Sequence, residues 1–573
     1  MTTRTFKIGI WASAAITMAA LLSPSPVLAQ DKLDPVLRVR AKQLLGRSRV
    51  IVDYHGDADV RAITQRGGRA GRQLEGFHGQ VAEIDNRVLA QLAADPRVAH
   101  VRPDRPAFVT MERTGAAIGA AVAREQFDVT GKGVGVAVID SGITAWHDDL
   151  YYRVGKRAGA ASRVVHFKDF TGPSGPSTWV ADVLSDEFGH GTHVAGTVAG
   201  SGYDSDGRRS GIAPGANLIG LKVLDGEGHG YVSDVIAAID YAIAVRRRYN
   251  IRVINLSVAT GVFESYRTDP LAQAARRAVD AGIVVVTSAG NLGVDANGRP
   301  QFSGITCPGN APWVLTVGAS SHEGTAGRRD DILARFSSRG PTSIDRAAKP
   351  DIVAFGVGTE SLSDPYSKLY STNAAYLLSG TRRTWYKPYL SLSGTSMAAP
   401  VVAGTIALML EANPDLTPNA VKAILEYTAE DRAESVLAEG AGLLNARGAL
   451  RMSRFFTNPQ RGLAAPGDTI EGQWTPWSQK VLWGNTLVAG GVPLPGSSAW
   501  NRNVEWGAET TATGQPVVWG AASQDDNIVW STRDDDNIVW STGGDDNIVW
   551  STGGDDNIVW STGGDDNIVW STG

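Results

Sequence analysis

The stretch SGTSMAAPVVAGTIALML, residues 393–410, decides how this chain is expected to fold. Small residues open it, and the apolar run over residues 397–410 predicts a buried helix that begins close to Ser396. The first backbone N–H groups of a helix have no partner inside it, and they form the positive end of the helix dipole. An anion developing beside Ser396 would therefore be stabilised. Most serines in such turns are helix caps, so a role for Ser396 as a nucleophile needs support from elsewhere in the chain.

Composition limits the kinds of protein this chain can be. It has 573 residues, 43% of them hydrophobic, and a net charge of -5. This length supports a large core and more than one domain, and the negative charge argues against a nucleic-acid partner. A single cysteine, Cys307, excludes an intramolecular disulfide. The sequence ITCPGNAP around it is typical of a packed turn rather than of a reactive thiol.

The first 29 residues predict a secretory signal peptide. Arg4 and Lys7 precede an apolar run over residues 8–22, and small residues lead to Ala29. The run is short for a membrane span. We therefore expect a secreted protein, extracellular or at the cell surface, with no transmembrane segment in its mature form.

The central part of the chain, residues 113–453, predicts an α/β domain. Apolar strands alternate with helices, a pattern typical of a parallel sheet with helices on both faces. Strands are expected over residues 134–140, 217–224, 253–258, 283–289 and 313–319, and helices are expected to begin near His190, Val232 and Pro270. In such sheets ligands bind at the carboxyl ends of the strands, and Asp140 and Asn291 fall at two of these ends.

Different patterns flank this domain. Residues 30–112 predict a small α+β domain of ferredoxin type. Residues 454–524 are rich in Gly, Pro and Trp, and residues 525–573 repeat DDNIVWST with a period of ten. An even period places each Ile and Trp on one face of a strand. A meander or a small stacked solenoid would result, and a disordered tail is the alternative.

Three residues could form a catalytic set with the order Asp, His, Ser. Asp140 lies in VIDSGI, His190 in HGTHVAG and Ser396 in GTSMAAP. Acyl transfer at neutral pH needs a hydroxyl nucleophile, an imidazole base and a carboxylate that orients the base. The amide of Asn291, in SAGN, could donate to the oxyanion. His193 is at helical spacing from His190, but zinc is not expected because no HExxH arrangement accompanies the pair.

These four motifs resemble those of the subtilisin-like serine proteases, the subtilases, over about residues 115–450. The resemblance implies an endopeptidase that hydrolyses extended polypeptides through an acyl-enzyme. It assigns Asp140 as the orienting acid, His190 as the general base, Ser396 as the nucleophile and Asn291 as the oxyanion donor. No cofactor is required for this chemistry.

The resemblance also gives residues 30–112 a role. They would be a pro-region that inhibits the enzyme by placing its tail in the cleft and is removed by self-cleavage between Ala107 and Thr114. We expect the mature enzyme to be a monomer.

Substrate contacts follow from the same resemblance. Two edges should pair with an extended peptide by β-augmentation, and Thr306 should lie along the floor of the primary pocket. The two edges comprise Gly228, His229 and Gly230 on one side and Ser257, Val258 and Ala259 on the other. The family usually has Gly where Ala259 stands, so its methyl group should narrow the pocket or tilt the bound strand.

A structural calcium ion is a further expectation from the resemblance. Some family members bind calcium in the loop that here contains Asp204 and Asp206. The usual Asn-rich loop is missing, so a solvated acidic loop is the favoured interpretation.

Two other classes of protein are alternatives to a protease. One is a catalytically inactive scaffold that binds surface glycans or proteins through its Trp-rich repeats, and it would lack a member of the triad. The other is a serine esterase, which would normally show GxSxG, whereas residues 394–398 read GTSMA. The complete triad favours the protease.

Overall fold

A computed structural model describes residues 32–573 with short gaps. The gaps are residues 43–44, 75–77, 105, 110–119, 155–156, 173–184, 296–297, 324–330, 433–434, 460–462, 464–465, 471–472, 490, 521–523, 532–537, 542–547, 552–557, 562–567 and 572–573. The predicted signal peptide and part of the predicted cleavage region lie outside the described residues. The described residues form two compact units, one of residues 32–73 and 78–103, the other of residue 74 and residues 104–571.

The first unit is a four-stranded antiparallel sheet with short helices. Its sheet order is β2-β3-β1-β4, the order of a ferredoxin-type α+β domain. Apolar side chains of alternate strand positions, such as Val50 and Val52, form its core with Leu92 from the helix α4. The elements are α2 (Pro35–Arg40), β1 (Arg47–Tyr54), α3 (Arg61–Thr64), β2 (Arg69–Leu74), β3 (Gly79–Asp85), α4 (Leu89–Ala93) and β4 (Val98–Pro103).

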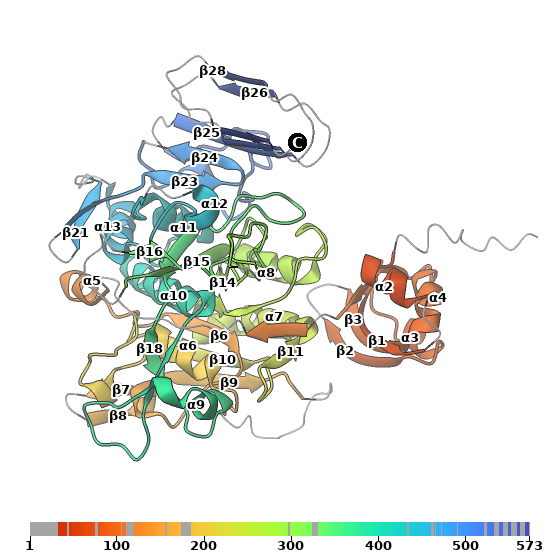
Figure 1. The fold of residues 1–573 in the computed structure, drawn as a ribbon, viewed down its shortest axis with the longest axis horizontal. Helices are drawn as coiled ribbons and strands as arrows, with labels where there is room; N and C mark the ends of the chain where they lie inside the picture. Colours follow the sequence, from red (N-terminus) through yellow and green to blue (C-terminus); the bar gives the residue numbers. More distant parts are fainter. Residues whose placement is uncertain are drawn as a thin grey trace, which may run out of the picture. The chain divides into compact units, whose positions relative to one another are not determined.

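The second unit is built on an eight-stranded sheet (Figure 1). Its order is β16-β15-β14-β12-β6-β10-β9, with β17 beside β15, and neighbouring strands run parallel except β15 and β16. The strands are β6 (Gly135–Asp140), β9 (Val164–Asp169), β10 (Asn217–Lys222), β12 (Ile251–Leu256), β14 (Val284–Ser288), β15 (Leu315–Ser321), β16 (Ile332–Leu333) and β17 (Ile352–Phe355). The predicted parallel α/β sheet is confirmed. The prediction missed the edge strand β9 and the short strands β16 and β17.

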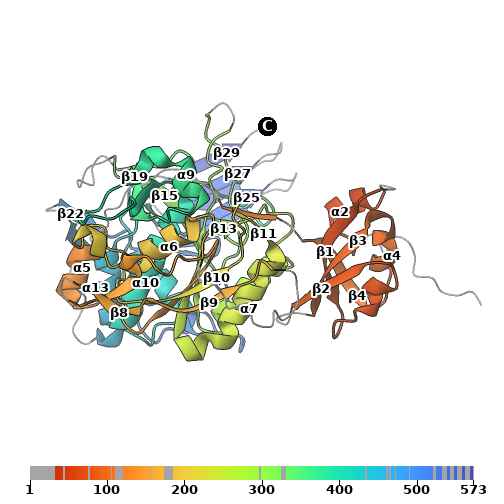
Figure 2. The same ribbon diagram turned by 90° about the horizontal axis from the view of Figure 1, so that it is seen from below.

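Two pairs of helices cover the sheet (Figures 1 and 2). Helix α6 (His190–Ala199) packs against α10 (Thr395–Ala412), and α7 (Val232–Tyr249) packs against α8 (Pro270–Asp280). Helix α10 is apolar on all sides because it is buried on all sides. Among the described residues it is the one helix long and apolar enough to cross a membrane. However, 89% of its 18 residues are buried inside the protein.

The segment after α13 (Ala446–Thr457) packs onto the same core. Trp477, Trp483, Trp500 and Trp506 are buried within the cluster that contains the sheet and α10. Two hairpins shape the segment, β21 (Gly467–Ile470) with β22 (Gln473–Pro476) and β23 (Lys480–Trp483) with β24 (Thr486–Ala489). The tryptophans of this segment therefore belong to the core of the second unit.

The decapeptide repeats form two stacks of parallel strands. Strands β25 (Gln524–Ser531), β27 (Ile548–Ser551) and β29 (Ile568–Ser571) form one stack, and β26 (Ile538–Ser541) and β28 (Ile558–Ser561) the other. The strands pair in register, so that each residue lies opposite the equivalent residue of the next strand, for example Trp530 opposite Trp550. Parallel pairing of alternate repeats makes a stacked solenoid, because a meander would pair neighbouring repeats antiparallel.

Candidate active site

His190 and Asp140 meet where β6 ends and α6 begins. Nδ1 of His190 lies 2.8 Å from Oδ1 of Asp140, and both side chains are fully buried. Because a carboxylate accepts, Nδ1 carries the proton and Nε2 is left to accept one. Nε2 has no hydrogen-bond partner among the described residues. Gly191 allows this approach, since a Cβ there would lie 2.2 Å from the carbonyl oxygen of Gly142.

Asp186, which the sequence analysis missed, holds the start of α6. Its carboxylate accepts hydrogen bonds from the N–H groups of Gly189 and Thr192 and from the hydroxyls of Thr192 and Ser141, all at 2.6–2.7 Å. A carboxylate at a helix N-terminus satisfies free N–H groups and interacts favourably with the dipole. The signal that could have identified it is an acidic residue four positions before a predicted helix start.

Asn291 contacts the start of α10, where Ser396 is the second residue. Oδ1 of Asn291 accepts hydrogen bonds from the backbone N–H and the hydroxyl of Thr395, each at 3.0 Å. These bonds fix which way the amide faces. Nδ2 is buried and has no partner within the described parts of the chain. The structure thus leaves an N–H donor near the helix that carries Ser396.

Ser257 and Ser396 hydrogen-bond each other. The hydroxyl of Ser396 donates to the carbonyl of Ser257 at 3.2 Å, and the hydroxyl of Ser257 donates to the carbonyl of Ser396 at 2.9 Å. Ser257 is predicted to belong to a substrate-pairing edge, and the pairs described for that edge are those of Val258 and Ala259 with β5. Ser257 is completely buried, because it lies between two strands with its side chain directed inward at α10. Its contacts hold the backbone and hydroxyl of Ser396 in place.

The two predicted edges flank an extended segment of the chain itself. Strand β5 (Pro106–Val109) lies between β11 (His229–Tyr231) and β13 (Val258–Ala259) in a three-stranded antiparallel sheet. His229 and Gly230 face residues 108 and 107, and Gly228 forms the turn before them at φ 80°. The strands β11 and β13 therefore hold an extended segment of this chain between them by β-augmentation.

Thr306 and Cys307 lie beside the end of this edge. Cys307 exchanges two backbone hydrogen bonds with Thr260, at 2.9 and 3.2 Å, and the Thr306 hydroxyl donates to the carbonyl of Ala289. Cys307 is completely buried, and its thiol donates to Asp269, the N-cap of α8, at 3.2 Å. These contacts make Cys307 a packing residue.

His193 has a structural role. Its Nε2 lies 3.0 Å from the carbonyl oxygens of both Thr359 and Leu390 and donates to them. Burial, with His190 nearby, lowers the pKa of His193 to about 3. The side chain is therefore neutral, with its proton on Nε2.

Comparison with known proteins identifies the family. Residues 131–448 match the family model described as the subtilase family. The chain belongs to the subtilases. It is 38% identical to serine protease AprX of Bacillus subtilis over 335 residues, which are 57% of this chain and 68% of AprX. It is 33% identical to subtilisin E of the same species over 391 residues, 68% of this chain and 84% of subtilisin E.

The match to a third relative spans a larger share of that relative's length. The extracellular serine proteinase of a Thermus species is 28% identical over 457 residues, which are 74% of this chain and 94% of that protein. Together the relatives and the family model show that the chain is a subtilisin-like serine protease, a peptide hydrolase.

Subtilases often bind calcium as a structural ion, and the residues predicted for it do not form a site together. Asp206 hydrogen-bonds Arg382 and Thr381. Asp204 instead lies near His147 and Asp149, with ligand atoms within 4.8 Å of one another.

This second group does not suit calcium either. Both ring nitrogens of His147 are engaged, Nδ1 by the N–H of Asp149 and Nε2 by the carbonyl of Pro388. The Asp149 carboxylate accepts from the N–H of Asp204 and the hydroxyl of Tyr389. One carboxylate oxygen, Oδ2 of Asp204, has no partner among the described residues. Calcium prefers oxygen ligands, whereas His147 offers ring nitrogens that already have hydrogen-bond partners.

Proposed function

We propose that this subtilase is a secreted endopeptidase that cuts extended polypeptides with Asp140, His190, Ser396 and Asn291, and that it matures by cutting itself. The observation that carries the proposal is β5, a segment of the chain seated between the two substrate-binding edges. A substrate strand would bind in the same place.

The chemistry follows from the hydrogen bonds of the site. Rotation about χ1 moves the Ser396 hydroxyl from the carbonyl of Ser257 toward Nε2 of His190, which takes its proton during attack on the peptide carbonyl. Asp140 keeps the proton on Nδ1 and stabilises the imidazolium. His190 then protonates the leaving amine, and water hydrolyses the acyl-enzyme.

The oxyanion is stabilised by the amide of Asn291 and by the positive end of α10. Nδ2 of Asn291 is the donor left available by the bonds of its Oδ1 to Thr395. This chemistry uses only side chains and backbone of the chain. The protein's own residues thus supply every role in hydrolysis.

The unit of residues 32–103 and strand β5 would form the pro-region. Its strand in the cleft excludes substrate until the chain is cut between Ala107 and Thr114. We place the mature enzyme outside the cell or on its surface, as a monomer.

Expression of the Ser396→Ala variant tests both catalysis and self-processing. The purified variant should keep the N-terminal unit, whereas the wild-type protein should begin within or just after residues 107–114, as measured by intact mass and N-terminal sequencing. Ser393→Ala, the same exchange three residues earlier, is the control and should process normally. A Ser396→Ala protein that is still cut, when purified free of other proteases, would disprove self-processing. Peptide-library cleavage by the mature wild type, absent in Ser396→Ala, tests hydrolysis separately.

A further inference from the structure

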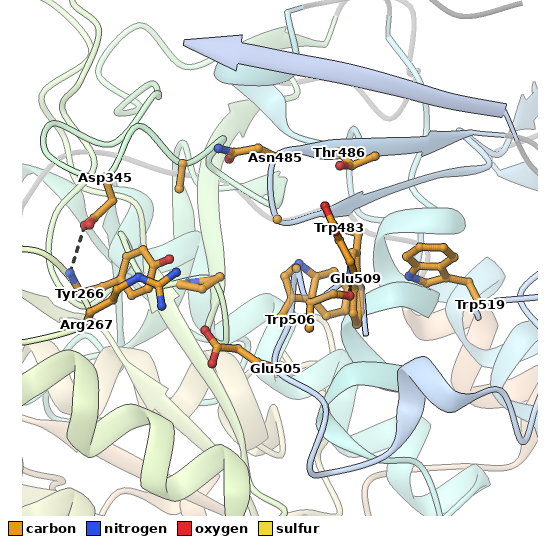
Figure 3. Close-up of a pocket in the computed structure, with 15 residues that line it drawn as sticks. Tyr266, Arg267, Asp345, Trp483, Asn485, Thr486, Glu505, Trp506, Glu509 and Trp519 are labelled. Carbon is orange, nitrogen blue, oxygen red and sulfur yellow. Dashed lines mark hydrogen bonds between the residues drawn. The ribbon is translucent and has the colours of Figure 1, made fainter. Parts of the chain in front are cut away.

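A cavity of about 580 Å³ lies between the catalytic domain and the segment after α13 (Figure 3). This volume is within the range of pockets that hold small molecules or several side chains. Tyr266 and Arg267 line it from the loop that follows the substrate edge β13, and Trp483, Trp506 and Trp519 line it from the C-terminal segment. The cavity is separate from the residues of the catalytic set.

The charged groups of the cavity are mostly acidic. Asp345, Glu505 and Glu509 line it together with one cation, Arg267. Asp345 accepts hydrogen bonds from the hydroxyl of Ser265 and the N–H of Tyr266, which are neutral donors and leave its charge in place. The cavity therefore favours a cationic ligand.

Three nearby aromatic rings already bind cations of the protein. Arg276 pairs with Glu505 at 2.9 Å and lies 5.1 Å from the ring centre of Trp313. Lys422 lies 4.3 Å from the ring centre of Trp506, and Arg267 lies 5.2 Å from that of Tyr266. Carboxylates and aromatic rings together form the usual environment of a guanidinium or ammonium group.

Two acids of the C-terminal segment line the cavity, Glu505 and Glu509. Glu505 pairs with Arg276, and Glu509 is the one without a cationic partner among the described residues. Its carboxylate has no ion pair with the described residues, although it lines the cavity beside Trp483 and Trp506 (Figure 3). A guanidinium there would make a charge-assisted hydrogen bond to Glu509 while its methylene stem packs against the partly exposed indole of Trp519. Because the volume far exceeds one side chain, a peptide segment rather than a single group fits it.

We propose that this cavity binds an arginine-containing segment of a polypeptide. A glycan is less suited, because stacking needs an exposed ring face and Trp483 and Trp506 are each only 3% exposed. Binding is independent of catalysis by Ser396. The loop that joins β13 to Tyr266 links this cavity to the substrate groove along the chain.

Isothermal titration of full-length Ser396→Ala protein tests the proposal. This background prevents cleavage of the probe, an acetylated and amidated Gly-Ser-Arg-Arg-Ser-Gly peptide. The same peptide with citrulline at both arginine positions is nearly isosteric and uncharged. We expect the arginine peptide to bind and the citrulline peptide to bind at least about tenfold more weakly, since one charge-assisted hydrogen bond contributes about that factor.

Variants locate the site. Glu509→Gln should weaken binding of the arginine peptide about tenfold, and Trp519→Ala should weaken it as well. Asp415→Asn removes an exposed carboxylate outside the cavity and should leave binding unchanged. Glu509 is exposed, so thermal unfolding of Glu509→Gln should match that of its parent.

Several results would overturn the proposal. They are equal affinity for the two peptides, no binding at millimolar peptide, an unchanged affinity in Glu509→Gln, and an equal loss in Asp415→Asn, which would indicate attraction to overall charge. Binding of chitohexaose in place of the arginine peptide would make the cavity a glycan site instead. Because cleavage is absent from this assay, its failure says nothing against the proposed hydrolysis.

Discussion

Helices α6 and α10 carry the two side chains proposed to exchange a proton, and they begin in different ways. At the start of α6 the carboxylate of Asp186 accepts four hydrogen bonds. At the start of α10 the carboxamide of Asn291 accepts two bonds from Thr395. A charged acceptor holds the first helix, and a neutral one holds the second.

The difference matches what each helix has to do. A full negative charge at the start of α6 neutralises the dipole there and fixes the backbone that carries His190. The same charge at α10 would repel the anion that forms beside Ser396. An amide supplies the acceptor that Thr395 needs and keeps an N–H donor for the oxyanion. The predictions below exchange or remove these groups.

The Asn291→Asp variant should have the largest effect. It keeps an acceptor for Thr395 but replaces the donor with a negative charge. In subtilisin, loss of the amide that donates to the oxyanion lowers kcat by about 10²–10³, and we expect at least that loss here with KM little changed. Steady-state hydrolysis of a chromogenic peptide measures it, with Asn291→Leu as the variant that removes the donor without adding charge. A kcat within a factor of two of wild type would refute the role of Asn291.

The Asp186→Asn variant should act mainly on stability. An asparagine side chain has one acceptor oxygen, whereas the N–H groups of Gly189 and Thr192 donate to different oxygens of Asp186. At least one of these buried N–H groups therefore loses its partner, which lowers the free energy of unfolding by about 1–3 kcal/mol. We expect a lower midpoint of thermal unfolding and a smaller loss of kcat, because the first turn of α6 also positions His190. Asp169→Asn, at the exposed end of β9, is the control and should change neither quantity. An unchanged midpoint would show that Asp186 does not hold the helix.

The sequence predicted the central sheet because its inner strands are uninterrupted apolar runs. Strand β9 was missed for the opposite reason: it is an edge strand, with exposed or partly exposed side chains at four of its six positions. The four motif residues were predicted because strand ends and helix starts are recognisable locally. Their bonds to one another were an inference from the family.

The rest of the site depends on contacts between distant segments. Ser257 has the local pattern of a substrate edge, and only the packing of β12 against α10 turns its hydroxyl toward Ser396. Asp206 has the local pattern of a calcium loop, and its partner Arg382 comes from a segment far along the chain. A single sequence does not show such pairings.

Arg382 extends the comparison to the other end of α6, where its guanidinium binds the loop after the helix. It donates to the carbonyl of Tyr203 at 2.7 Å and to Asp206 at 3.1 Å. Arg382→Ala should lower stability by about 1–2 kcal/mol, measured as the unfolding midpoint in a Ser396→Ala background. The difference in unfolding midpoint between Arg382→Ala and its parent should be the same in EDTA and in millimolar calcium. The midpoint of Arg382→Lys should lie between those of Arg382→Ala and the parent. If EDTA lowered the parent to the level of Arg382→Ala, calcium would be holding the loop.

Asp204 is the counterpart of Asp186, a buried carboxylate with one oxygen that lacks a partner among the described residues. Burial, reinforced by the charges of Asp149 and Asp148, raises the pKa of Asp204 to about 7. The folded protein therefore keeps a proton that the unfolded chain releases near pH 4, so this group's contribution to stability is lost as pH rises from about 4 to 7.

The Asp204→Asn variant, whose side chain stays neutral at every pH, should test whether ionisation of Asp204 causes this loss of stability. Against its Ser396→Ala parent, the variant should unfold at a similar temperature at pH 4 and a few degrees higher at pH 8, the excess growing between these values. Asp186→Asn should show the reverse sign at pH 8, because the carboxylate it replaces has four donors. If Asp204→Asn were destabilising at pH 8, the Asp204 carboxylate would be paired in its charged form, by a cation or a bound ion. The two aspartates would then be held in the same way, and the contrast would lie in their ligands rather than in their charge.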